Sequence, residues 1–205
     1  FRAGELDATV LSGGAYAAYK ADPELSKGLI EVAELFTRHM GMNVQKAPFN
    51  DVRVRQAINY AIDSNLIISR LVKDKAYRAT SWLPPSSAAF DKTMKPYAFD
   101  PEKAKSLLAE AGYPNGFSLD LDAPNFAPFV NLAQSIQSTF AQGGVTVNIV
   151  SSEMAPMLTK YRAREHQALV DVALVGDLAG VDGRRFDQHH GPCRVAGGTA
   201  ATLLE

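Results

Sequence analysis

Four aspartates toward the C-terminal end of the chain are the residues best suited to acid–base chemistry: Asp171, Asp177, Asp182 and Asp187. Two carboxylates can divide the roles of general acid and general base, and a hydrolase would use Asp177 and Asp182 in this way. The sequence around them contains no serine or cysteine nucleophile elbow and no HExxH motif. A solvated loop carboxylate is the simpler interpretation of each, so we expect no catalytic residue and no enzyme.

Two other groups could bind a cofactor. His189, His190 and Cys193 offer nitrogen and sulfur ligands that suit zinc or copper, but their irregular Gly-Pro context supplies no fourth ligand. The glycine pairs at 13–14 and 143–144 lack the spacings of the GxGxxG and P-loop motifs. We therefore expect no metal, no nucleotide and no other cofactor.

Composition limits the partners. The 205 residues are 46% hydrophobic and 21% charged, which is typical of a globular protein. The formal net charge of −1 does not suit a protein that neutralises many phosphates, so we expect no nucleic acid partner. No apolar run approaches the roughly 18 residues of a membrane span, and residues 1–5 do not form a secretory signal. Both ends look cut, which suggests a longer protein.

Helices are indicated first in the middle of the chain. Asp51 is an N-cap candidate, and apolar residues at three-to-four-residue spacing follow it, which predicts one helix over about 51–71. The Pro-rich stretch 76–99 is typical of an extended surface loop. Asp100 and Pro101 then begin a second helix that Gly112 ends.

Strands and helices alternate after this point. Residues 117–121 and 145–149 alternate between apolar and polar, and the apolar run 169–175 predicts a third strand. Helices are predicted at 128–142 and at 154–166 between them. This β-α-β-α-β order implies crossover connections and a largely parallel sheet with flanking helices, an α/β class. Because ligands of such sheets gather beyond the carboxyl ends of strands, a site is expected at 176–185.

Two long motifs carry a family resemblance. Residues 42–63, MNVQKAPFNDVRVRQAINYAID, closely resemble a signature of the family-5 extracellular solute-binding proteins. Pro84-Pro85, DPEKAK at 100–105 and LLAEAGYPNGF at 107–117 follow in the family's order. Gly4-Glu5-Leu6-Asp7 is similar to the family's G-x-x-D turn, so the resemblance extends to about Gly180.

The resemblance implies the substrate-binding component of an ABC-type importer, with a periplasmic-binding-protein-like (class II) fold. Such a protein captures a peptide-like solute between two closing lobes and delivers it to the transmembrane subunits of the ABC permease. Residues 1–48 would be the C-terminal part of the first lobe with the hinge, and residues 49–205 an incomplete second large lobe. The location would be periplasmic, or the cell surface as a lipoprotein, after export by a signal peptide absent from this chain.

Candidate ligand-binding residues follow from the same resemblance. In peptide binders of the family a loop aspartate commonly pairs with the ligand's ammonium group. Asp182 is similar to that aspartate in position. The family's neighbouring tryptophan and proline are replaced here, so a sugar, a chelated metal or an anionic solute is an alternative ligand, and a solute sensor an alternative function. Trp82 could line the pocket or fill the core. The expected ligand-binding set is Asp182, Asp177, Gly176, Arg184, Trp82 and Asn125.

Two arginines are also unusual for their position. Arg53 and Arg55 lie in the first turn of the predicted helix, where the helix dipole opposes positive charge. Partners outside the helix must therefore explain these two arginines, and we interpret them as forming a salt bridge between lobes.

Overall fold

The computed structural model describes residues 8–9, 11, 13–31, 36–71, 76–81, 83–85, 87 and 90–174. The helices of this part of the chain are α1 (Gly13–Ala21), the 3-10 helix η1 (Leu25–Gly28), α2 (Val52–Ala61), α3 (Ser64–Leu71), α4 (Pro101–Glu110), α5 (Phe129–Gln142) and α6 (Met154–Arg162). The strands are β1 (Phe36–Met42), β2 (Phe117–Pro124), β3 (Val145–Ser152) and β4 (Ala168–Leu174).

The strands form one mixed sheet in the order β1-β4-β2-β3. β2 pairs in parallel with β3 over its whole length and with β4 at Leu121 and Asp122, whereas β1 pairs antiparallel with β4. The predicted β-α-β-α-β order is therefore confirmed as β2-α5-β3-α6-β4, and so is the α/β class with a mostly parallel sheet and flanking helices.

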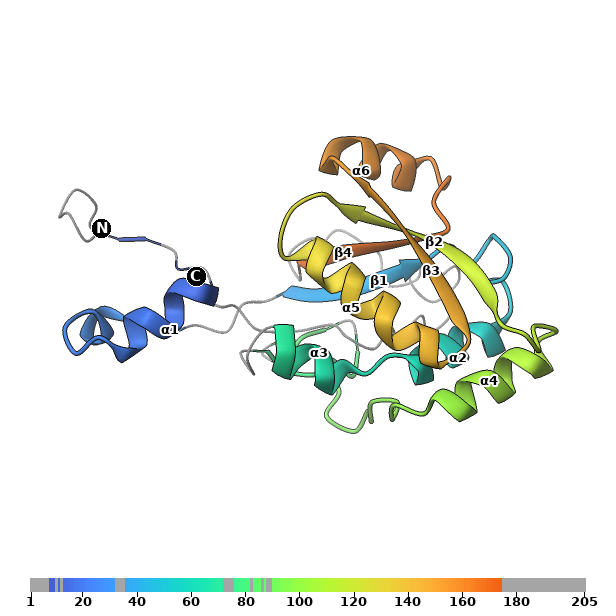
Figure 1. Ribbon diagram of the computed structural model, residues 1–205, viewed down its shortest axis with the longest axis horizontal. Helices are drawn as coiled ribbons and strands as arrows, with labels where there is room; N and C mark the ends of the chain where they lie inside the picture. The colour runs from blue at the N-terminus through green and yellow to red at the C-terminus, as the bar shows by residue number, and fades with distance from the viewer. Residues whose placement is uncertain are drawn as a thin grey trace.

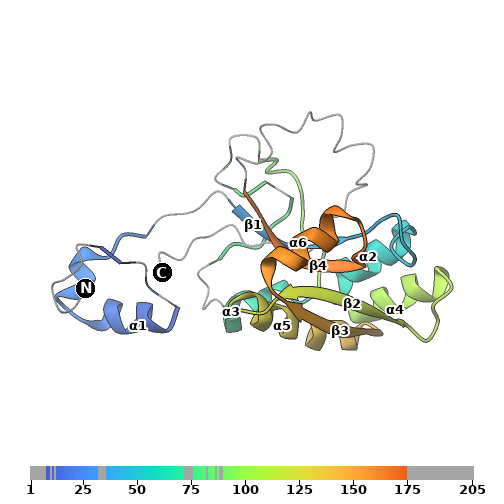
Figure 2. The ribbon, with the colours of Figure 1, turned by 90° about the horizontal axis from the view of Figure 1, so that it is seen from above.

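The helices cover the two faces of the sheet unequally. Leu119, Leu121 and Ala123 of β2 are buried in a core shared with α2, α4 and α5. Side chains of a strand alternate between faces, so Asp122 points to the opposite face, where it contacts α6. Figure 1 shows α6 above the strands and α2, α3 and α4 below them. The helices α1 and η1 lie to one side of this unit in both views (Figures 1 and 2).

Local signals explain where the helices begin. Asp51 Oδ1 accepts a hydrogen bond from the Arg53 N–H at 2.8 Å and caps α2. Asp100 Oδ1 accepts one from the Lys103 N–H at 2.9 Å and caps α4, with Pro101 in the first turn. Both caps are the ones that the sequence predicts.

The single helix expected over 51–71 is wrong. Ile62 adopts an extended conformation (φ −98°, ψ 122°) and ends α2. Asp63 Oδ1 then accepts a hydrogen bond from the Leu66 N–H at 2.9 Å, so a second capping aspartate begins α3. The predicted helix over 154–166 likewise ends earlier, at Arg162, and Arg164 has a left-handed φ of 59°.

Strand β1 is the main element that the sequence did not predict. It pairs with β4 from Phe36 to Met42, and Met40 and Met42 are buried in the common core. Beyond it, Asn43 Nδ2 donates to the carbonyls of Arg164 and His166 at 2.9 and 3.0 Å. Residue 48 therefore does not coincide with a break in packing, because residues 36–48 share a sheet and a core with residues after 49. The assignment of 1–48 and 49–205 to two lobes stays a prediction.

Candidate functional site

A polar pair lies at the carboxyl edge of the sheet, where β2 and β3 end together. Pro124 and Ser152 are register partners, and the Asn125 N–H donates to the Ser152 carbonyl at 2.9 Å. The Asn125 side-chain amide donates to Glu153 Oε1 at 2.9 Å, and both residues are exposed. An amide and a carboxylate are thus held side by side where an open α/β sheet binds its ligands.

An aromatic group adjoins this pair. Phe126 follows Asn125 and is 45% exposed, while its ring packs edge-on against Phe129 with centroids 5.2 Å apart. Phe129 is buried at the start of α5 and so fixes the position of the exposed ring. The edge can therefore offer a hydrogen-bond donor, a negative charge and an apolar surface to one solute.

A partly buried ion pair joins α6 to the face of the sheet opposite the main core. Lys160 Nζ of α6 lies 2.7 Å from Asp122 Oδ1, and the Asp122 side chain is 3% exposed. His166 is also buried, and its ring lies against Tyr161. Burial lowers the pKa of His166, and the negative charge of Asp122 partly offsets this effect. The pair ties α6, and with it Glu153 at the N-terminus of α6, to the C-terminal half of β2.

Of the residues predicted to bind ligand, Asn125 lies within the described part of the chain. Trp82, Gly176, Asp177, Asp182 and Arg184 lie outside it, so their roles stay predictions. Glu153 is a residue that sequence reasoning missed. Its position directly after a strand of the parallel sheet is the signal that would have found it.

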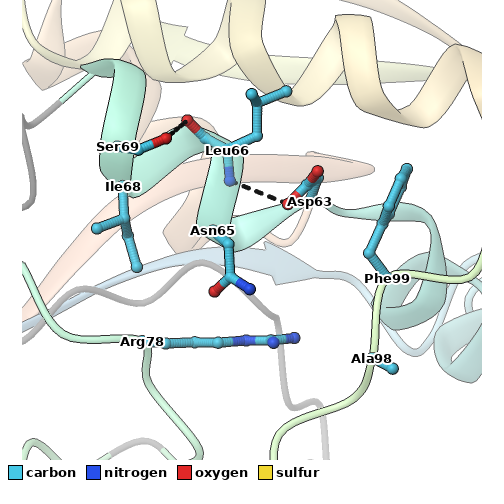
Figure 3. Close-up of a pocket in the computed structure, with 8 residues that line it drawn as sticks. All are labelled: Asp63, Asn65, Leu66, Ile68, Ser69, Arg78, Ala98 and Phe99. Carbon is cyan, nitrogen blue, oxygen red and sulfur yellow. Dashed lines mark hydrogen bonds between the residues drawn. The ribbon is translucent and has the colours of Figure 1, made fainter.

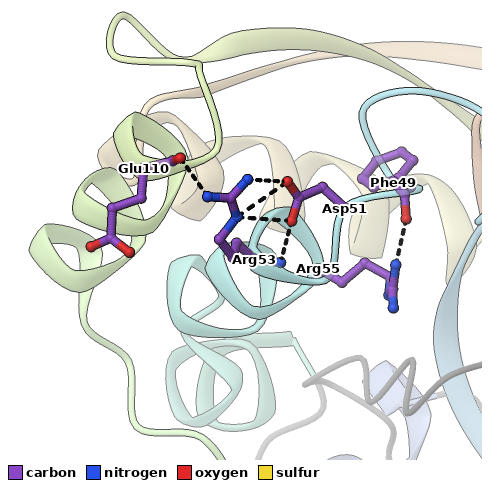
Figure 4. A network of polar contacts seen from close by, with 5 residues as sticks. All are labelled: Phe49, Asp51, Arg53, Arg55 and Glu110. Carbon is purple, nitrogen blue, oxygen red and sulfur yellow. Dashed lines mark hydrogen bonds and ion pairs between the residues drawn. The ribbon is translucent and has the colours of Figure 1, made fainter.

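Arg53 and Arg55 have local partners rather than the expected partners in another lobe (Figure 4). Arg53 Nη2 pairs with Asp51 Oδ2 at 2.6 Å, and Arg53 Nη1 donates to the Glu110 carbonyl at the C-terminal end of α4 at 2.6 Å. Arg55 Nη1 donates to the Phe49 carbonyl at 2.7 Å. These partners lie at the cap of α2 and in the last turn of α4, and a salt bridge of these arginines with another lobe stays a prediction.

Within the described residues, no three His, Cys, Asp or Glu side chains are grouped so that they could hold a metal ion. None of the described helices is long and apolar enough to cross a membrane.

The sheet, its flanking helices and the polar carboxyl edge define a lobe of the periplasmic-binding-protein class. Among solved structures, the chain is similar to the ABC transporter-associated periplasmic binding protein DppA from Helicobacter pylori in complex with the peptide STSA. The TM-score is 0.73 with 28% identity, over 85% of this chain and 34% of that one. The chain belongs to the bacterial extracellular solute-binding proteins, family 5, because the family model described as "family 5 Middle" matches residues 1–183. This is a family of binding proteins and not of enzymes.

Curated relatives support the same membership. The chain is 37% identical over 166 residues to the heme-binding protein A of Haemophilus influenzae and 37% identical over 150 residues to the dipeptide-binding protein of Escherichia coli. These matches cover 78% and 71% of this chain. They cover 29% and 28% of the relatives, so the chain spans less than a third of the length of either.

Proposed function

We propose that the chain is part of the substrate-binding component of an ABC-type importer that captures a peptide-like solute by lobe closure and delivers it to the membrane permease. The observation that carries this proposal is the family match over residues 1–183. The choice of a peptide rests on the relatives. The dipeptide-binding protein is 37% identical to this chain, and the similar solved structure contains a bound peptide.

The carboxyl edge is the part of the lobe that would face the solute. Asn125 would donate to a peptide carbonyl, Glu153 would attract its cationic end, and Phe126 would cover an apolar side chain. Asp182 is our choice for the direct partner of the ligand's ammonium group, and Asp177, Gly176, Arg184 and Trp82 would complete the site. Residues 1–48 would then belong to the first lobe and hinge, and residues 49–205 to the second.

Location and partners follow from the same role. A family of extracellular solute-binding proteins works outside the cytoplasmic membrane, so the protein would be periplasmic or a lipoprotein at the cell surface, exported by a signal peptide. The solute and the transmembrane subunits of the permease would be its two partners. No cofactor is required, because recognition makes and breaks no covalent bond.

The test uses protein expressed from the complete reading frame. It is incubated with a panel of dipeptides, tripeptides and haem, and the retained solute is identified by native mass spectrometry and recovered by denaturation. We expect one class of peptide to be retained and recovered unchanged. A peptide that is consumed during the incubation would indicate a hydrolase, and retention of haem without any peptide would contradict the choice of solute.

Substitutions at the carboxyl edge of the sheet test whether the solute binds there. Asn125→Ala removes one hydrogen bond and should weaken peptide binding by roughly 2- to 10-fold. Asn148→Ala is the matched control, because Asn148 Nδ2 also donates to a carboxylate, that of Asp120 at 3.2 Å, but lies within β3 rather than at its carboxyl end. Equal effects of the two substitutions would remove the carboxyl edge from the site.

A further inference from the structure

A pocket lies between the N-terminal part of α3 and the connection that joins α3 to α4. It has a volume of about 800 Å³ and opens widely to solvent. Asp63, Asn65 and Leu66 line it from the start of α3, and Arg78 and Phe99 line it from the long connection between α3 and α4 (Figure 3). This volume falls within the range of about 300–1,000 Å³ that is typical of small-molecule sites.

Two opposite charges face the pocket without neutralising each other directly. Asp63 and Arg78 are both within the described part of the chain, and they form no ion pair with each other. They are nevertheless close enough for the charge of Asp63 to raise the pKa of Arg78, against the larger lowering effect of burial. A ligand with separate positive and negative groups could therefore interact with both side chains.

The local hydrogen bonds orient these charges and leave part of each available. Asp63 uses Oδ1 to cap α3 at the Leu66 N–H, which leaves Oδ2 for another donor. Arg78 donates from Nη2 to the Tyr97 carbonyl, and its buried Nε has no hydrogen-bond partner. A guanidinium group has five N–H donors, so one bond does not exhaust its capacity for a carboxylate.

The remaining lining is mostly apolar, with Asn65 and Ser69 as its polar residues. Figure 3 shows the Asn65 amide pointing toward the Arg78 side chain, and Phe99 on the same side of the pocket as Asp63. Leu66, which is 40% exposed, and Phe99 both line the pocket and give it an apolar surface. The pocket thus combines one positive group, one negative group, an amide and an apolar wall.

We propose that this pocket binds a small zwitterion, an α-amino acid with an apolar side chain, with its carboxylate on Arg78 and its ammonium group on Asp63. The apolar side chain lies against Leu66 and Phe99, and Asn65 hydrogen-bonds the carboxylate. The site is separate from the carboxyl edge that contains Asn125 and Glu153, and the inference does not depend on transport of a peptide.

L-leucine is the probe, titrated into the 205-residue chain and followed by calorimetry and by amide chemical shifts. We expect saturable binding with shifts at residues 63–69 and 98–99. N-acetylleucine lacks the ammonium group and leucinamide lacks the carboxylate, so each should bind at least tenfold more weakly. Absence of leucine binding, or equal binding of the three compounds, would overturn the proposal.

Two variants separate binding from folding. Asp63→Asn removes the negative charge but keeps an equally good N-cap residue, so α3 should stay intact while leucine binding weakens tenfold or more. Arg78→Gln should have a similar effect on leucine. Asn125→Ala should not change leucine binding, although it weakens peptide binding if the proposed function is correct. Leucine binding that is lost in Asn125→Ala but kept in Asp63→Asn would assign leucine to the carboxyl edge and refute this site.

Discussion

Lys160 and Asp122 connect the outer helix to the interior of the sheet: Lys160 Nζ lies 2.7 Å from Asp122 Oδ1, and the aspartate side chain is only 3% exposed. Sequence periodicity places Asp122 among the outward-facing polar residues of a half-buried strand. The structure buries it because α6 covers this part of the face. A buried carboxylate needs its cation, so the contact should matter more than an ordinary surface ion pair.

Lys160→Met should therefore destabilise the chain. Loss of one partner of a fully buried pair costs about 3–5 kcal/mol, and because the lysine is 37% exposed we expect about 2–3 kcal/mol, measured as the free energy of unfolding in urea. Lys105→Met is the matched control. Lys105 pairs with Glu102 at 2.8 Å on an exposed helix face, and its loss should cost less than about 0.5 kcal/mol. Equal losses would show that burial of Asp122 is unimportant.

The stability should also fall in mild acid. Burial lowers the pKa of His39 on β1 to about 4, an effect larger than the opposing hydrogen bond with the backbone of Thr37. The unfolded chain therefore binds a proton at His39 between pH 6.5 and about 4 while the folded chain does not, so stability is full above pH 6.5 and is lost as the pH falls. Between pH 7.5 and 5 the loss should be about 2 kcal/mol.

Urea unfolding at both pH values measures this difference. His39→Gln should reduce it, and the remainder should come partly from His166, whose pKa burial lowers in the same direction. An unchanged pH dependence in His39→Gln would mean that His39 titrates normally in the folded chain.

Asp51 should stabilise α2 mainly as a cap and not through its ion pair with Arg53. Asp51→Ala removes the hydrogen bond from the Arg53 N–H and should lower the free energy of unfolding by about 1 kcal/mol. Asp51→Asn keeps the cap and removes the charge, so its effect should be clearly smaller. Thermal and urea unfolding would decide between the two contributions, and equal losses would favour the ion pair.

Two glycines with positive φ should respond differently to alanine. Gly112, after α4, has a φ of 94° and nothing within 4 Å of a new Cβ, so only backbone strain of about 1–2 kcal/mol is expected. Gly116 has a φ of 75°, and a Cβ there would lie 1.8 Å from the Gly144 carbonyl oxygen. Because the backbone must move, Gly116→Ala should cost about 3 kcal/mol or more in urea unfolding. Similar losses at the two positions would contradict this contact.

Local sequence patterns predicted the helices and strands whose formation depends on residues close in sequence. Alternation predicted β2 and β3, and the aspartates at 51 and 100 predicted the starts of α2 and α4. The break at Ile62–Asp63 was missed because Ile62 and Leu66 continue a helical i, i+4 spacing across it, while the side chain of Asp63 caps a new helix. β1 was missed because Arg38 interrupts the alternation of Phe36, Met40 and Met42, and because its strand conformation depends on pairing with β4, about 130 residues away.

The site could be predicted only in part for the same reason. The position of Asn125 follows from the carboxyl-edge rule for parallel sheets, but its contact with Glu153 depends on the common end of β2 and β3. The contact of Asp122 with Lys160 joins positions 38 residues apart through the packing of α6 on the sheet, which no local pattern contains.

Calorimetric titration of dipeptides into the protein expressed from the complete reading frame, with and without Asp182→Ala, tests whether the protein is a peptide receptor. We expect saturable binding of one dipeptide per protein. An ammonium group buried by lobe closure needs a carboxylate, and the loss of that partner costs about 3–5 kcal/mol, so the variant should bind at least about a hundredfold more weakly. Failure of every dipeptide to bind would contradict the peptide-receptor assignment, and an unchanged affinity in the variant would remove Asp182 from the site.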